Sequence, residues 1–171
     1  MPRATVIGWL LGIMIAGLSP SAAWSEEAAD PAALGKALGA AKVTLQQGLT
    51  ASEREGQPIS AKFEIDGGRL QLSVYIANSG KFAEVVVDYK TGAIGKTEPI
   101  TGGDDLTAAK AQRASLAGVK TSLSDATDKA EAESPGYRAI SVTPSLKQKH
   151  SVAIVELLKG SQIKTAVVPL S

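Results

Sequence analysis

The sequence predicts an α+β fold in which helices cover antiparallel strands, and three observations lead to this prediction. Residues 59–65 alternate between apolar and polar side chains, which is typical of a half-buried strand. Tight-turn triplets, Asp-Gly-Gly at 66–68 and Asn-Ser-Gly at 78–80, separate this run from two further apolar runs. A capping box, Thr-Leu-Gln-Gln at 44–47, begins a helical pattern just before the strands. The predicted order is therefore a helix followed by an antiparallel meander.

Composition places the chain of 171 residues among ordinary globular proteins, because 44% of it is hydrophobic and 20% is charged. Lys and Arg number 18 against 17 Asp and Glu, so charge gives no argument for binding nucleic acid or an anionic membrane surface. The absence of cysteine removes disulfides, thiolate metal sites, cysteine nucleophiles and lipid attachment at a cysteine. With one histidine, a zinc site would need three carboxylates or a partner chain. We therefore expect neither a metal nor a cofactor.

Residues 1–25 are predicted to be a secretory signal peptide. Arg3 gives a positive start, residues 4–18 are an apolar run, and Ser-Pro at 19–20 ends it before small residues. The run is shorter than the ~20 residues that cross a bilayer. An uncleaved anchor is the alternative. We expect a periplasmic or secreted protein with no stable membrane insertion after signal cleavage.

Residues 26–100 are predicted to form the first half of the exported chain. In its helix, Leu45, Leu49 and Ser52 fall on one face at helical spacing. The Ala-rich segment 31–41 before this helix is expected to join or brace the fold. The predicted strands cover residues 59–65, 70–76 and 82–89, and a short fourth strand begins at 93–94.

The second of these strands has two contrasting faces. Its apolar side chains are predicted to face the helix: Leu70, Leu72, Val74 and Ile76. Gln71, Ser73 and Tyr75 lie on the opposite face, and one face of an antiparallel sheet often stays in solvent. We predict that these three residues form a partner-binding face. The alternative is that Tyr75 packs against the other half of the chain.

The stretch VVVDYKTGAI at 85–94 ends a strand in a tight turn and starts another strand. The Asp88 side chain is expected to accept hydrogen bonds from the turn, and Gly92 supplies the left-handed residue. Asp88, Thr91 and Gly92 are interpreted as turn-forming residues and not as a site.

Residues 101–171 are predicted to repeat this pattern after a linker at 100–104 and a helix at 106–117. At an offset of 78, Leu45 matches Leu123, and Ser-Val-Tyr-Ile at 73–76 matches Ser-Val-Ala-Ile at 151–154. The predicted strands are 138–142, 146–157 and 163–168. No equivalent of the DYKTG turn follows, so the second meander is expected to lack a fourth strand.

The order of helix, meander, DGGRLQLSVYIA and closing D-x-x-T-G resembles the PepSY domain over residues 41–98. The stretch from VKTSLSDATDKAEAESPGYRAISV to HSVAIVELLKG resembles a second, degenerate copy. The resemblance implies two units, each a helix packed on a meander of 3–4 antiparallel strands. It also implies a noncatalytic module that binds protein partners outside the cytoplasm, one form of which restrains a peptidase.

Few other residues are candidates for catalysis or for binding a cation. His150 has no identifiable carboxylate partner and is expected to face solvent. Glu64, Asp66 and Asp88 are candidates for a hard-cation cluster, and the competing interpretation is scattered edge and turn charges.

Two classes of function therefore remain. The first is an exported module, not an enzyme, that binds a protein or peptide, with a peptidase as one candidate partner and no nucleic acid. The alternative is a small-ligand carrier or enzyme that uses a pocket between the repeats. Self-association through sheet edges is a third possibility.

Overall fold

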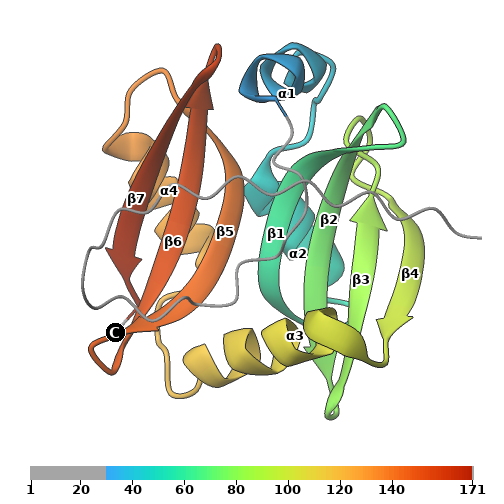
Figure 1. The fold of residues 1–171 in the computed structure, drawn as a ribbon, viewed down its shortest axis with the longest axis vertical. Coiled ribbons are helices and arrows are strands. Elements are labelled where there is room, and N and C mark those ends of the chain that lie inside the picture. The colour runs from blue at the N-terminus through green and yellow to red at the C-terminus, as the bar shows by residue number, and fades with distance from the viewer. Residues whose placement is uncertain (1–29, 171) are drawn as a thin grey trace, which may run out of the picture.

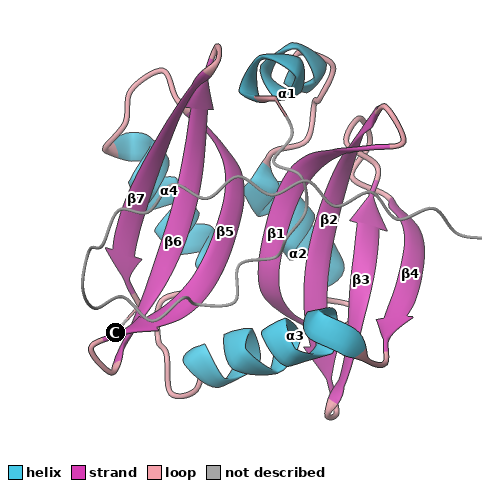
Figure 2. Cartoon of the chain, in the orientation of Figure 1, coloured by secondary structure: helices cyan, strands magenta, loops and turns pink. Residues whose placement is uncertain are grey.

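The computed structural model describes residues 30–170, which contain helices on both faces of one antiparallel sheet (Figures 1 and 2). The predicted signal peptide lies outside the described residues. The elements in chain order are α1 (Pro31–Leu38), α2 (Leu45–Ser52), β1 (Gln57–Asp66), β2 (Arg69–Asn78), β3 (Lys81–Val87), β4 (Ile94–Ile100), α3 (Gly103–Ser115), α4 (Leu123–Ala132), β5 (Arg138–Lys147), β6 (His150–Lys159) and β7 (Gln162–Pro169). The α+β class is confirmed.

The seven described strands form a single sheet in the order β4-β3-β2-β1-β5-β6-β7. Two meanders, β1–β4 and β5–β7, meet at the antiparallel pair of β1 and β5. This junction is short, because the paired residues there are Ala61 with Val142 and Lys62 with Ser141. The expected meanders are therefore present as the two parts of one continuous sheet.

The two faces of the sheet carry different helices. In Figure 1, α2 and α4 lie behind the sheet and α3 crosses in front of it. The rear face holds the main core, and its fully buried members include Ile59, Leu72, Val74, Val85, Val142, Val155 and Leu157. Burying each such side chain contributes about 1.5–3 kcal/mol. The apolar face predicted for β2 is confirmed, because all four of its residues are buried.

Side-chain caps fix the starts of the two rear helices. At α2, the Thr44 hydroxyl accepts from the Gln47 amide at 3.1 Å, and the Gln47 side chain accepts from the Thr44 amide at 2.9 Å. At α4, the Ser122 hydroxyl accepts from the Asp125 amide at 3.0 Å. Gly48 of α2 lies where a Cβ would come within 2.6 Å of the Leu72 side chain, so the missing side chain lets α2 approach β2 closely.

Strand pairing in the two halves matches at an offset of 81, which agrees with the predicted match of the valines at 86–87 and 167–168 but not with the match of 73–76 to 151–154 at 78. Tyr75 pairs with Ser60 next to a bulge, and Glu156 pairs with Ser141 next to a bulge in the corresponding place. The helix caps keep the offset of 78, from Thr44 to Ser122. Three additional residues therefore lie between helix and strand in the second half, and they displace every later match.

The strand predicted at 146–157 is wrong, because a hairpin turn interrupts it. Gln148 and Lys149 adopt positive φ angles of 50° and 68°, as Gly67 and Gly68 do at 52° and 77° in the first half. This turn was missed because neither residue is a glycine. The first strand of the second half is longer than the predicted 138–142, and Pro144 lies within it at a position that pairs with Ala153 of β6.

The DYKTG turn has the predicted geometry. Oδ1 of Asp88 accepts from the Lys90 amide at 2.9 Å, the Thr91 amide at 2.7 Å and the Thr91 hydroxyl at 3.0 Å. Gly92 has a φ of 77°. These hydrogen bonds hold the pKa of Asp88 below its usual range.

Candidate functional site: the front face and the β7 edge

The predicted partner-binding face is largely covered, so that prediction is wrong for two of its three residues. Ser73 is 0% exposed and Tyr75 is 6% exposed, whereas Gln71 is half-buried. Helix α3 accounts for part of this cover, since the Ser60 hydroxyl on the same face donates to Oε1 of Gln112 in α3 at 2.8 Å. Tyr75 is buried, as the alternative that it packs against the other half of the chain requires.

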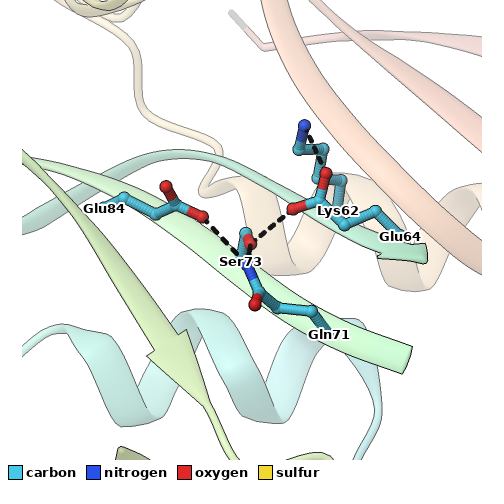
Figure 3. Close-up of polar contacts among 5 residues, drawn as sticks. All are labelled: Lys62, Glu64, Gln71, Ser73 and Glu84. Atoms are coloured by element: carbon cyan, nitrogen blue, oxygen red, sulfur yellow. Dashed lines mark hydrogen bonds and ion pairs between the residues drawn. The ribbon is translucent and has the colours of Figure 1, made fainter. Parts of the chain in front are cut away.

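A network of polar side chains occupies this front face, and Figure 3 shows five of its members. Ser73 donates to Oε1 of Glu64 at 2.6 Å, and Nζ of Lys62 lies 2.7 Å from Oε2 of the same carboxylate. The Gln71 amide donates to Oγ of Ser73 at 2.9 Å and to Oε1 of Glu84 at 3.3 Å. The network therefore links β1, β2 and β3 through their side chains.

Tyr75 lies beside this network. Its ring centroid is 5.8 Å from Nζ of Lys62. Burial is the main cause that raises the pKa of the Tyr75 hydroxyl, and the charges of Glu84, Glu64 and Asp105 raise it further. The hydroxyl therefore stays protonated at neutral pH.

The chemistry of this network favours structure over catalysis. A serine nucleophile needs a base that accepts its proton and a second group that orients the base. Ser73 donates to a carboxylate whose other oxygen is held by Lys62, and His150 lies on the exposed β5–β6 hairpin. The hydrogen bonds from Ser73 to Glu64 and from Gln71 to Glu84 join neighbouring strands, so the network holds the sheet face together.

The carboxylate cluster proposed for a hard cation does not form. Glu64 is engaged on the front face, Asp66 ends β1, and Asp88 caps the turn after β3. Within residues 30–170, no group of three His, Cys, Asp or Glu side chains is placed to hold a metal ion.

A shallow groove of about 270 Å³ lies between the two halves of the chain. Leu49, Glu53 and Pro58 line it from the first half, and Leu116 and Leu123 line it from the second. This groove is the place that the carrier-or-enzyme alternative would use. The groups with shifted pKa values lie elsewhere: Tyr75, Asp88 and Arg138.

The two outer edges of the sheet differ in their protection. Strand β4 carries Pro99, which has no amide hydrogen, and the exposed pair Lys96 and Glu98 with 2.7 Å between charged atoms. A register shift at Val86/Val87 also distorts this edge. Charges, proline and bulges are features that prevent another strand from pairing with an edge. Strand β4 is therefore a guarded edge.

Strand β7 is the less guarded edge, because its one charged residue, Lys164, donates to Ser134 on the rear face and its pairing has no register shift. Its Ile163 and Val167 are 47% and 44% exposed, and its regular pairing with β6 spans eight residues without a register shift. Ile163 and Val167 share the front face, because they pair with Leu158 and Ile154, which alternate with the buried rear residues of β6. The proline of β7, Pro169, stands at its end.

The outer side of β7 is open among the described residues. At the offset of 81, β7 corresponds to β3, since Val85 pairs with Val74 as Ala166 pairs with Val155. The outer side of β3 is covered by β4, whereas β7 has no such neighbour among residues 30–170. The residues predicted to bind a partner lie on β2 and not on this edge.

Among the described residues, no helix is both long and apolar enough to cross a bilayer. No protein-family model matches the sequence, and a search of curated proteins finds no significant match. A search of solved structures finds the crystal structure of a protein described as a putative lipoprotein from Clostridium difficile 630. The match has a TM-score of 0.42 and 11% sequence identity, and it covers 70% of this chain and 79% of the other.

Proposed function

We propose that this chain is an exported, noncatalytic module that binds an extended segment of another protein along β7. The observation that carries the proposal is the open edge of β7, where Ile163 and Val167 are exposed and no strand pairs with the outer side among residues 30–170. An exposed edge offers a row of backbone donors and acceptors, and proteins recognise extended peptides by adding a strand there. Restraint of a peptidase is one form of this activity, in which the bound segment belongs to the peptidase.

The PepSY-like interpretation of the two halves supports the same proposal. The bulges and hairpin turns recur at the offset of 81. A further tie recurs as well: the Tyr89 carbonyl accepts from the amides of Lys42 and Val43, and the Leu170 carbonyl accepts from those of Lys120 and Thr121. We interpret residues 30–170 as two PepSY-like units fused through β1 and β5.

Export is part of the proposal and rests on the charged start, apolar run and small residues of 1–25. A periplasmic or secreted protein of this kind would meet its partner outside the cytoplasm. Fractionation of cells that express the full-length sequence tests this step: the processed chain should appear outside the cytoplasm, and an unprocessed cytoplasmic chain would contradict it.

Photocrosslinking tests the binding edge. A photoreactive amino acid is placed at Thr165, in the middle of β7, and for comparison at Thr97, in the middle of guarded β4. We expect covalent adducts from position 165 that disappear in a Val167→Lys background, and none from position 97. Equal adducts from both positions, or adducts that survive Val167→Lys, would show that β7 is not the binding surface.

A further inference from the structure

We infer that the segment bound along β7 is an antiparallel strand with an acidic residue opposite Lys164 and apolar residues opposite Ile163 and Val167. This inference rests on the proposed function and specifies the chemistry of its partner. The template is the pair β3–β4 of the same molecule, because β4 occupies on β3 the place that is open on β7.

The template gives the register of the bound strand. Phe82 pairs with Ile100, Ala83 with Pro99 and Val86 with Lys96. Adding 81 to the β3 residues places Ile163, Lys164 and Val167 opposite the corresponding positions of the incoming strand. Directly opposed residues on one face interact, so the side chain at each of these positions is selected by its neighbour on β7.

The front face of the edge selects apolar side chains. Ile163 and Val167 are exposed there, and an incoming strand would shield both. Thr165 is the one front-facing residue of β7 between Ile163 and Val167. A β-branched residue on the incoming strand suits the position opposite Thr165. The incoming strand therefore has two apolar side chains on one face, with a β-branched or small residue between them.

The rear face of the edge selects an acidic side chain. Nζ of Lys164 and Nζ of Lys159 lie 6.0 and 5.8 Å from the centroid of the Tyr137 ring, so two positive charges flank one ring. Lys164 donates to the hydroxyl of Ser134 at 2.8 Å. Among the described residues, no carboxylate lies within salt-bridge distance of either ammonium group. An acidic residue opposite Lys164 would supply the missing negative charge.

A synthetic peptide tests the inference directly. The probe is capped Ile-Gly-Val-Thr-Thr-Glu-Ile, which keeps the β4 register and places Val, Glu and Ile opposite Val167, Lys164 and Ile163. The matched control replaces Glu by Lys. Calorimetry with the purified processed chain should show that the Glu peptide binds about fivefold or more tightly, and this ratio should fall at high salt. Hydrogen exchange should slow in β7 and remain unchanged in β4.

Charge reversal and an exposed-residue control complete the test. In Lys164→Glu the preference should reverse, so that the Lys peptide binds more tightly. Val167→Lys should abolish binding of both peptides, whereas Leu146→Lys should not, because Leu146 is 55% exposed but lies on β5, which β6 separates from β7.

The outcomes separate this inference from the proposed function. Equal binding of both peptides with protection of β7 would overturn the acidic preference and leave strand addition standing. No binding of either peptide, together with no crosslinks from position 165, would overturn both. A doubled mass in light scattering that Val167→Lys returns to the monomer would show that the occupant is a second copy, and it would overturn the inference of an acidic partner strand.

Discussion

Replacing Arg138 by methionine should destabilise the protein, because this side chain ties the second half of the chain to the first. Its guanidinium donates to the carbonyl oxygens of Leu38 at 3.1 Å and Val43 at 2.8 Å, which flank the loop between α1 and α2. The same group lies 5.3 Å from the centroid of the Phe63 ring. Burial lowers the pKa of the guanidinium, and the charge of Glu131 partly offsets this effect.

The magnitude follows from what the substitution removes. A hydrogen bond to a charged group contributes about 1.5–3 kcal/mol, and a cation–π contact contributes about 0.5–1 kcal/mol at exposed sites. Arg138 is half-buried, so water replaces part of the loss at the two carbonyl oxygens. We expect the free energy of unfolding to fall by about 2–4 kcal/mol, which corresponds to roughly 5–15 °C in Tm.

Urea unfolding monitored by circular dichroism measures this change, with Arg54→Met as the matched control. The side chain of Arg54 is 64% exposed and lies 3.7 Å from the Glu55 carboxylate, so its loss should stay within about 0.5 kcal/mol. If Arg138→Met were also to lose less than about 0.5 kcal/mol, the two hydrogen bonds would not hold the halves together, and the reasoning would be refuted.

Three further predictions concern single turns and contacts. Gly35→Ala should lower Tm measurably by thermal melting, because a Cβ at this position of α1 would overlap the carbonyl oxygen of Gly160 in the β6–β7 turn; an unchanged Tm would show that α1 does not pack there. Lys149→Gly should stabilise the protein by about 1 kcal/mol in urea, because its φ of 68° is unfavourable for a side chain and not for glycine; a loss of stability would contradict this. Asp88 has a lowered pKa, so its carboxylate should stabilise the fold above the unfolded pKa near 4 and lose this effect as the pH falls through the folded pKa. The stability difference between wild type and Asp88→Asn should therefore shrink on acidification, and a difference that does not change with pH would refute the capping role.

Local chemistry explains why several elements could be predicted from the sequence. The Thr44 capping box and the Asp88 turn are formed by residues a few positions apart, and both have the predicted hydrogen bonds. The alternation of 59–65 likewise identified β1. In such cases the residue types that form the structure are neighbours in the sequence, so the pattern contains the needed information.

Contacts between distant segments could not be predicted in this way. Alternation along β2 separated its two faces correctly, but it does not show that α3 crosses the second face and places Gln112 against Ser60. The predicted site failed for this reason: a polar residue on a strand faces solvent only if no other element covers it. The β5–β6 turn was not predicted for a different reason. Gln148 and Lys149 adopt left-handed backbone angles that are uncommon for these residue types.

Binding and stability should depend on different residues of this fold. The rear core and the Arg138 contacts hold the two meanders in one sheet; β7 contributes Val168 to this core, whereas Ile163 and Val167 lie outside it. Val167 is 44% exposed, so Val167→Lys should change the free energy of unfolding by no more than about 0.5 kcal/mol. The same substitution replaces an apolar side chain on the front face of the open edge by a charge, which an incoming strand could cover only at the cost of desolvating it. If the Val167→Lys chain is folded but no longer binds a strand, the loss of binding is therefore due to the changed edge of β7 and not to unfolding.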